Sequence, residues 1–282
     1  MELLTLSDAI AAHVRDGQSI ALEGFTHLIP FAAGHEIIRQ RRRNLHLIRM
    51  TPDLIYDQLI GMGCAERLTF SWGGNPGVGS LHRLRDAVER LWPQPLALFE
   101  FTHAQMAVAY QAGASGLTYG LMRRYTDTQL ADVSDSRVRT INCPFSGTAH
   151  TAVPAINPDI TVLHAQQVDA EGNVLIRGIV GAAKEAALAA RRVLVTVEEQ
   201  VESLQADMNS VVLPSWVITA VSIVPGGAYP SYAQGYYPRD NGFYLAWDEI
   251  ARDRNVFSAW MQQHVLELRE HADLLRLLGV AA

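Results

Sequence analysis

A strand, a helix and a second strand follow one another in residues 16–50, DGQSIALEGFTHLIPFAAGHEIIRQRRRNLHLIRM. The apolar run Ser19–Leu22 predicts a buried strand, and a helix is expected from Pro30 to Arg43. Proline suits the first helical turn, because the N–H that it lacks has no partner there. Leu45–Met50 predicts the next strand. This is the βαβ unit from which parallel sheets are built.

The same alternation continues on both sides of this unit. Upstream, Ser7–Arg15 is predicted to be a helix with Ser7 as its N-cap. Downstream, strands and helices are expected at helix 52–62, strand Leu68–Ser71, helix Leu81–Trp92, strands Leu96–Phe99, Ile160–Gln166 and Val174–Ile176, helix Lys184–Ala190, and strands Val193–Val197 and Val217–Val224. The expected fold class is α/β, an open, mostly parallel sheet with flanking helices. We expect residues 1–282 to form a single domain with a helical C-terminal extension at about 242–282.

The composition is that of a globular protein, with 49% hydrophobic and 18% charged residues among 282. The net charge of −6 argues against a nucleic-acid partner. No apolar stretch reaches the ~20 residues needed to cross a membrane, and the early acidic residues argue against a secretory signal. Cys64 and Cys143 lie far apart with no CxxC spacing, which favours a reduced, cytoplasmic setting. No HxH or HExxH spacing suggests a metal site.

In open α/β sheets, ligands bind beyond the carboxyl ends of the strands, so the residues there are the candidate site. The first strand ends in Glu23–Gly24–Phe25. Gly24 permits a close approach of the backbone to a ligand, and amides exposed there can stabilise an oxyanion. A tight turn that needs glycine is an equally good interpretation. The dinucleotide fingerprint GxGxxG is absent.

The third strand leads into a glycine-rich loop, Ser71–Ser80, of sequence SWGGNPGVGS. Four glycines before a helix predict a cradle of backbone amides, suited to a carboxylate, a carbonyl oxygen or a phosphate. No Lys–Ser/Thr pair follows, which excludes a nucleotide P-loop. The predicted substrate pocket consists of Gly24, Phe25, Ser71, Gly73, Gly74, Asn75 and Ser80.

The fourth strand ends at Glu100, and His103 follows closely. A carboxylate and an imidazole at a strand end are candidate catalytic groups for proton transfer. The alternative is that Glu100 or Thr102 caps the helix Ala104–Ala112. No GxSxG motif supports a serine nucleophile.

Two groups of motifs give the chain a family resemblance. Residues 16–25, followed by Pro30, resemble the signature of family I CoA-transferase A subunits, in which an Asp-Gly turn leads through an apolar strand into Gly-Gly-Phe. Over roughly residues 5–230 the chain resembles the A subunit of glutaconate CoA-transferase and its relatives. The more specific matching segments, in order, are Pro144–Gly147, Ala152–Ala155, Asn157–Asp159, His164–Gln166, Asp169–Asn173 and Arg192–Glu199.

This resemblance implies a fold of the CoA-transferase/ribose-phosphate-isomerase type and an enzyme that works with a partner B subunit. It implies transfer of CoA between an acyl-CoA and a small carboxylic acid, dicarboxylic or 3-oxo, through a glutamyl-CoA thioester. The nucleophilic glutamate belongs to the B subunit, whereas the A subunit supplies the opposite wall of the pocket. A hetero-oligomer, A2B2 or A4B4, is expected. Coenzyme A enters as the acyl-CoA substrate, and no permanently bound cofactor is expected.

Two departures from the family pattern leave alternatives open. Glu23 stands where the signature has its first glycine. The glycine expected before Pro30 is also missing, since Leu28 and Ile29 occupy that stretch. Some relatives resemble ring-opening hydrolases acting on CoA-linked steroid fragments, so a CoA-thioester-linked hydrolase of the same fold is the main alternative. A ligand sensor or isomerase-like single chain is a third. Glu171–Gly172–Asn173 has the composition of the nucleophile motif in the wrong order. We therefore expect no transfer by this chain alone.

Overall fold

The computed structural model describes residues 1–123 and 137–280. In these ranges the strands of the main sheet follow the order β1-β13-β11-β9-β2-β3-β4-β5, and all of these neighbours pair in parallel. The strands are β1 (Glu2–Leu3), β2 (Ser19–Glu23), β3 (Leu45–Ile48), β4 (Ala65–Phe70), β5 (Ala97–Glu100), β9 (Ile160–Val168), β11 (Val193–Gln200) and β13 (Ala220–Ile223). Two further strands, β10 (Val174–Arg177) and β12 (Ser210–Leu213), extend β9 in antiparallel fashion. The predicted open, mostly parallel sheet is confirmed.

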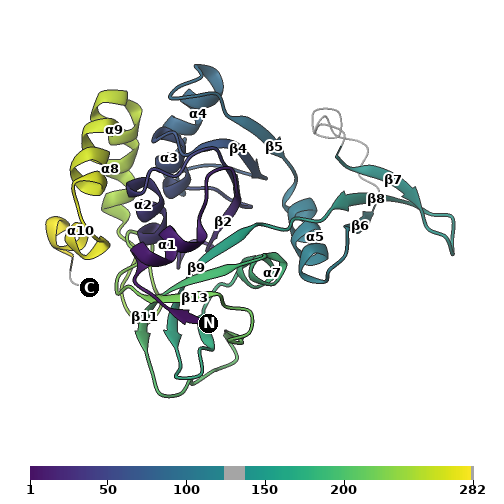
Figure 1. Ribbon diagram of the computed structural model, residues 1–282. Coiled ribbons are helices and arrows are strands. Elements are labelled where there is room, and N and C mark those ends of the chain that lie inside the picture. The colour runs from purple at the N-terminus through teal and green to yellow at the C-terminus, as the bar shows by residue number, and fades with distance from the viewer. Residues whose placement is uncertain (124–136, 281–282) are drawn as a thin grey trace.

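Helices cover both faces of the sheet (Figure 1). The helices are α1 (Leu6–His13), α2 (Phe31–Arg39), α3 (Leu54–Gly61), α4 (His82–Glu89), α5 (His103–Ala114), α7 (Ala183–Ala189), α8 (Asn241–Arg252), α9 (Arg254–Met261), the π-helix η1 (Gln262–Leu266) and α10 (His271–Leu278). Ile20 and Leu22 of β2 pack into a core with helices α1, α2, α3, α8 and α9, whereas Ala21 between them packs into a core with α5 and α7. This alternation follows from the two-residue period of a strand.

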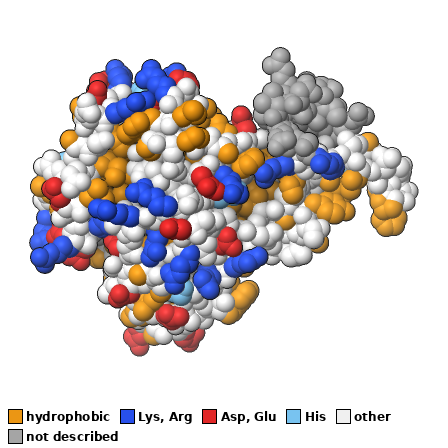
Figure 2. Space-filling model, turned by 45° about the horizontal axis from the view of Figure 1, so that its top comes forward, with side chains coloured by type: hydrophobic (Ala, Val, Ile, Leu, Met, Phe, Trp, Pro, Cys, Tyr) orange, Lys and Arg blue, Asp and Glu red, His pale blue; other side chains and the backbone are white. Residues whose placement is uncertain are grey.

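An antiparallel arm projects from the body beside α5 (Figure 1). It consists of β6 (Tyr119–Arg123), β7 (Arg139–Asn142) and β8 (Ala149–Pro154), in the order β6-β8-β7. No sequence pattern indicated this sheet, because its strands lack a long apolar run. Hydrophobic side chains gather on the surface of the arm (Figure 2). The exposed residues of the arm include Tyr119, Leu121 and Phe145, the last of which is 97% exposed.

Some predicted details are wrong at element ends. The N-cap of α1 is Thr5, whose Oγ1 accepts a hydrogen bond from the Asp8 amide at 3.1 Å, and Ser7 lies within the helix. The strand predicted at Val217–Val224 begins only at Ala220, after a turn. Glu198 lies within β11 rather than beyond its end. Such shifts arise because end positions depend on caps and pairing partners that periodicity does not show.

Candidate active site

The turn after β2 lies where the carboxyl ends of β2, β3 and β4 meet. A Cβ at Gly24 would come within 2.6 Å of the Leu28 carbonyl oxygen, so no side chain fits there. Thr26 and Leu28 both adopt left-handed backbone conformations, with φ of 63° and 52°. Residues held in such sparsely populated conformations cluster at functional sites. Within the described part of the chain, the amides of Phe25 and Thr26 donate to no backbone or side-chain acceptor. The turn therefore presents free donors.

A cavity of about 270 Å³, the Arg239 cavity, opens beside this turn. Phe25, Trp72 and Tyr244 form aromatic walls. Phe25 is 36% and Trp72 is 47% exposed, whereas Tyr244 is buried. The charged groups that line the cavity are Arg49, Asp53 and Arg239. Its volume lies just below the roughly 300–1,000 Å³ of pockets for drug-sized ligands, so it suits a small substrate group.

Arg49, which directly follows β3, connects the Gly24 turn to Asp53 at the edge of this cavity. Its Nη2 donates to the Gly24 carbonyl at 2.5 Å, and its Nη1 donates to Asp53 Oδ1 at 3.1 Å. Both side chains of this ion pair are almost completely buried. A buried pair of this kind fixes geometry, because removing either partner leaves an uncompensated charge. Arg49 thus holds the Gly24 turn against the start of α3.

Glu23 is buried beneath the turn and carries a perturbed carboxyl group. Tyr110 Oη donates to Glu23 Oε1 at 2.8 Å. Burial raises the pKa of Glu23 to about 7, although the charge of Arg49 and the hydrogen bond from Tyr110 oppose the shift. The residue that replaces the family glycine is therefore a titratable group below the candidate oxyanion donors, and it lines neither the Arg239 cavity nor the larger cavity beside it.

That second cavity, of about 510 Å³, is the Tyr110 cavity and lies between α5 and α7. Its walls include Met50, Tyr110 and Ile179, with Glu185 of α7 also lining it. Phe25 lines both cavities. A ligand that passes Phe25 can therefore contact both, with an apolar portion in the Tyr110 cavity and an anionic portion near the arginines.

The glycine-rich loop borders the Arg239 cavity through Trp72 and Pro76, and most of its amides are already paired. The amides of Ser71, Trp72, Gly74, Asn75, Val78 and Gly79 all donate to backbone carbonyls. Ser71 Oγ donates to the Met50 carbonyl at 2.7 Å, and Asn75 Nδ2 donates to the Tyr244 carbonyl at 2.8 Å. A Cβ at Gly74 would meet the Trp72 ring at 2.6 Å, whereas one at Gly73 would make ordinary contacts. Three of the paired amides donate to Met50 and Pro52 outside the loop, and three donate within it. The amides of Gly73, Gly77 and Ser80 have no acceptor among the described residues, so the amide cradle stays a prediction. Ser80 is exposed at its end.

Glu100 ends β5 and His103 begins α5, and both are exposed. Thr102 between them is the helix cap: its Oγ1 accepts from the Gln105 amide at 3.0 Å, and Gln105 Oε1 accepts from the Thr102 amide at 2.7 Å. This capping box leaves Glu100 without a capping role. Neither Glu100 nor His103 lines the Arg239 cavity or the Tyr110 cavity.

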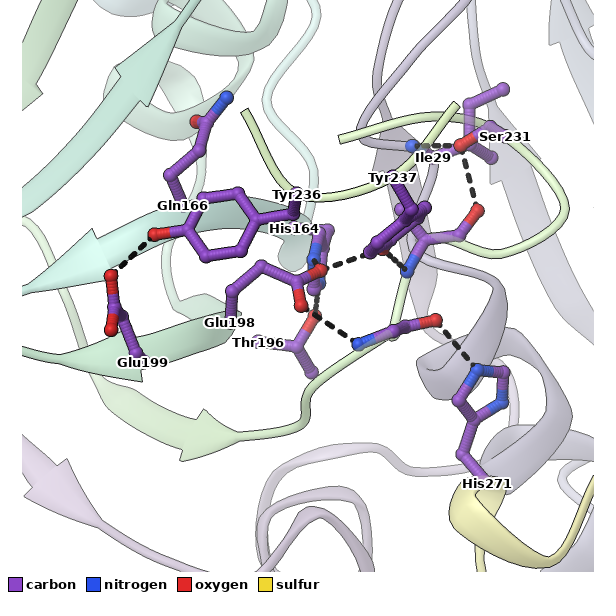
Figure 3. Close-up of polar contacts among 12 residues, drawn as sticks. Ile29, His164, Gln166, Thr196, Glu198, Glu199, Ser231, Tyr236, Tyr237 and His271 are labelled. Atoms are coloured by element: carbon purple, nitrogen blue, oxygen red, sulfur yellow. Dashed lines mark hydrogen bonds and ion pairs between the residues drawn. The ribbon is translucent and has the colours of Figure 1, made fainter. Parts of the chain in front are cut away.

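A buried polar cluster lies beneath the aromatic loop 225–240 (Figure 3). His164 Nε2 is 2.6 Å from Glu198 Oε1, and Tyr237 Oη donates to the same oxygen at 2.6 Å. The Gly226 amide donates to Glu198 Oε2 at 2.8 Å, and Thr196 Oγ1 contacts His164 Nδ1 at 2.8 Å. Burial alone raises the pKa of Glu198, but these hydrogen bonds, above all that with His164, bring it below its usual value. The cluster fastens the loop to β9 and β11.

Sequence reasoning missed Thr26, Arg49 and Arg239. Arg49 stands directly after an apolar strand, so the strand-end rule that selected Gly24 also applies to it. Arg239 lies about 15 residues beyond β13 in a loop without periodicity, and nothing local marks it. Among the described residues, no group of three or more His, Cys, Asp or Glu could hold a metal ion. In the same ranges, no helix is long and apolar enough to cross a membrane.

The chain belongs to the coenzyme A transferase family, whose model matches residues 3–223. Within the family it is of the A-subunit type. The A subunit of the 3-oxoadipate CoA-transferase of Pseudomonas knackmussii is 59% identical over 96% of both chains. The A subunit of the glutaconate CoA-transferase of Acidaminococcus fermentans is 30% identical over 99% of this chain and 92% of that one.

A solved structure supports the same assignment. The glutaconate CoA-transferase from Acidaminococcus fermentans superposes with a TM-score of 0.91, covering 99% of this chain and 93% of that chain at 30% identity. The cholesterol ring-cleaving hydrolase IpdA subunit of Rhodococcus jostii is 24% identical over 92% of this chain and 89% of its own. The hydrolase alternative therefore has less support than the transferase.

Proposed function

We propose that this chain, together with a B subunit, moves CoA between an acyl-CoA and a small carboxylic acid, dicarboxylic or 3-oxo. The observation that carries the proposal is the state of the two carboxylates at the Gly24 turn. Asp53 is bound in its ion pair with Arg49, and Glu23 is buried under Tyr110. Neither is placed to attack a thioester. The similarity to the A subunits of 3-oxoadipate and glutaconate transferases supports both the acid class and the need for a partner.

In this reaction an oxygen of the partner's glutamate attacks the thioester carbonyl, and the C–S bond breaks to release CoA as a thiolate. The thiolate then attacks the glutamyl carbonyl of the resulting anhydride, which releases the first acid as its carboxylate and leaves a glutamyl-CoA thioester. The second acid reverses these steps. The free amides of Phe25 and Thr26 are the proposed donors to the oxyanion that forms at each attack.

Glu100 and His103 are the proposed proton-transfer groups, and their role is in the hydrolase alternative, because the transfer steps above move no proton. Gly24, Phe25 and the loop residues Ser71, Gly73, Gly74, Asn75 and Ser80 form the proposed pocket wall. Glu100 and His103 are exposed at the carboxyl edge, where a partner that brings the nucleophile has to dock. The exposed apolar residues of the arm, Tyr119, Leu121 and Phe145, continue that edge through α5, and we propose that the B subunit covers them. The assembly expected is A2B2 or A4B4, with cytoplasmic location.

The test is reconstitution. The chain is purified alone and with the protein that co-purifies from its native host, and transfer from an acyl-CoA to an acceptor acid is measured. Transfer by the complex and not by the single chain supports the proposal. Loss of thioester at the same rate without an acceptor acid would instead establish a hydrolase. An isolated chain with no partner and no turnover would favour a ligand sensor.

A further inference from the structure

Arg239 is a cation without an anion. Its Nη2 donates to the Pro76 carbonyl at 2.8 Å, and its guanidinium carbon lies 3.9 Å from the centre of the Tyr244 ring. Its Nε is buried and has no hydrogen-bond partner. Among the described residues, no carboxylate forms an ion pair with it. Buried donors are usually paired, so an orphaned one that lines a cavity indicates a group that arrives with a ligand.

The charges around the cavity do not cancel. Arg49 and Asp53 neutralise each other in their ion pair, and Arg239 then leaves one positive charge over. Burial raises the pKa of Asp53, and the nearby charges of Arg49 and Arg239 oppose that shift. Both carboxylate oxygens of Asp53 already contact Arg49. A half-buried cavity with one excess cation is complementary to a ligand group with a single negative charge.

The walls between Arg239 and the Gly24 turn are apolar. Phe25, Ile29 and Trp72 can contact a short methylene chain, and the free amides of Phe25 and Thr26 lie at the end where a carbonyl would react. A molecule that fits this arrangement has a carboxylate at one end, a few carbons, and the reacting carbonyl at the other. An acid with one carboxyl group would leave Arg239 unpaired.

The position of Arg239 is fixed by its own loop. Tyr229 Oη donates to Asp240 Oδ2 at 2.5 Å, and Asp240 Oδ1 accepts from the Phe243 amide as the cap of α8. Further back, Tyr237 Oη accepts from the Ala228 amide at 3.1 Å and donates to Glu198. The residues on either side of Arg239 are thus fixed in place. A guanidinium in a fixed position favours ligands whose carboxylate reaches it and disfavours ligands whose carboxylate lies elsewhere.

We propose that Arg239 is the residue that selects acids with a second carboxylate, which it binds at the end of the molecule away from the thioester. The proposal rests on the transferase function above and narrows its acid class to dicarboxylates. It also assigns discrimination to the loop after β13 rather than to the glycine-rich loop.

The test compares adipate with hexanoate as acceptors in the reconstituted complex of both subunits. The two acids have the same number of carbons and differ in the second carboxylate. We expect Arg239→Gln to lower kcat/KM for adipate by about 10²-fold and that for hexanoate by less than about 3-fold. Arg239→Lys should restore part of the loss, since it keeps the charge but not the planar fork. Arg177→Gln is the matched control, because Arg177 contacts Gln205 and Asp207 away from both cavities.

An unchanged preference for adipate in Arg239→Gln would overturn the proposal, as would an equal loss for both acids together with a lower melting temperature. If the complex transfers CoA to neither acid, the dicarboxylic part of the proposed function fails, whereas binding of the second carboxylate by Arg239 can still be measured. Calorimetric titration of adipate into the wild-type and Arg239→Gln complexes then measures that binding. Equal affinities would show that Arg239 does not bind the second carboxylate.

Discussion

The Glu198 cluster and the Arg239 cavity both include residues of the loop 225–240, yet the polar atoms are fully paired in the cluster and only partly paired at the cavity. In the cluster, both oxygens of Glu198 and both nitrogens of His164 have partners. At the cavity, Nε of Arg49 and Nε of Arg239 are buried without any, and two residues of the adjoining turn adopt left-handed conformations. Complete pairing stabilises a fold, whereas incomplete pairing beside a cavity indicates binding. The comparison predicts that changes in the cluster affect stability and changes at the cavity edge affect turnover.

The largest effect is expected in the cluster. Glu198→Ala removes the acceptor for His164, Tyr237 and the Gly226 amide and should lower the free energy of unfolding by ~3–5 kcal/mol. Glu199→Ala is the matched control, because this neighbour is exposed and should cost less than ~1 kcal/mol. Urea denaturation measures both. If Glu198→Ala fails to fold, Tyr237→Phe should still show a loss of about 1 kcal/mol. Equal stability of the Glu198 and Glu199 variants would show that the cluster does not stabilise the fold.

Glu23 should give stability a pH dependence of known sign. Its pKa is about 7 in the folded chain against an ordinary value of 4.5. Between these values the folded state keeps a proton that the unfolded state releases, so the free energy of unfolding falls as pH rises, by up to about 3 kcal/mol. Glu23→Gln should abolish that slope, so the variant should gain more stability over the wild type at pH 8 than at pH 4. If the stabilities of the wild type and of Glu23→Gln change in parallel from pH 4 to pH 8, the carboxyl of Glu23 does not have a raised pKa in the folded chain.

Glu100→Gln tests the exposed edge of the site, where changes should affect rate rather than stability. As a proton-transfer group, Glu100 should contribute about 10²-fold to any hydrolysis of the thioester by the complex and little to CoA transfer, which moves no proton. Its exposure keeps the change in stability below ~0.5 kcal/mol. Initial rates and melting temperatures of the two-subunit complex check both. Wild-type rates would leave Glu100 as a polar edge residue.

The smallest effect is expected in the glycine-rich loop. Gly74→Ala places a Cβ against the half-exposed Trp72 ring, which must turn away from the Arg239 cavity, and turnover should fall by about 10-fold. Gly77→Ala has open space but a φ of 79°, so it should cost ~1 kcal/mol of stability with little change in rate. The reverse pattern, rate loss at Gly77 and none at Gly74, would show that the loop acts through its backbone rather than through Trp72.

The parallel core was predictable because strands buried on both faces are short apolar runs, such as Ile20–Leu22 and Leu45–Ile48, which local sequence shows directly. The turn at Gly24 followed from the rule that sites lie at strand ends. The arm was not predictable, since β6 and β8 are stabilised by pairing between distant segments and β8 alone has no distinctive pattern. Arg239 was missed for a similar reason: its place is set by Glu198, 41 positions earlier, through contacts that only the fold creates.

The central claim is that this chain forms half of a transferase site whose nucleophile belongs to a partner. The direct measurement is borohydride reduction of the two-subunit complex after treatment with acyl-CoA, followed by mass spectrometry of both chains. The account predicts that one glutamate of the partner is reduced and that this chain is unmodified, including Glu185 in the Tyr110 cavity. A reduced glutamate on this chain, or sustained transfer by this chain alone, would contradict it.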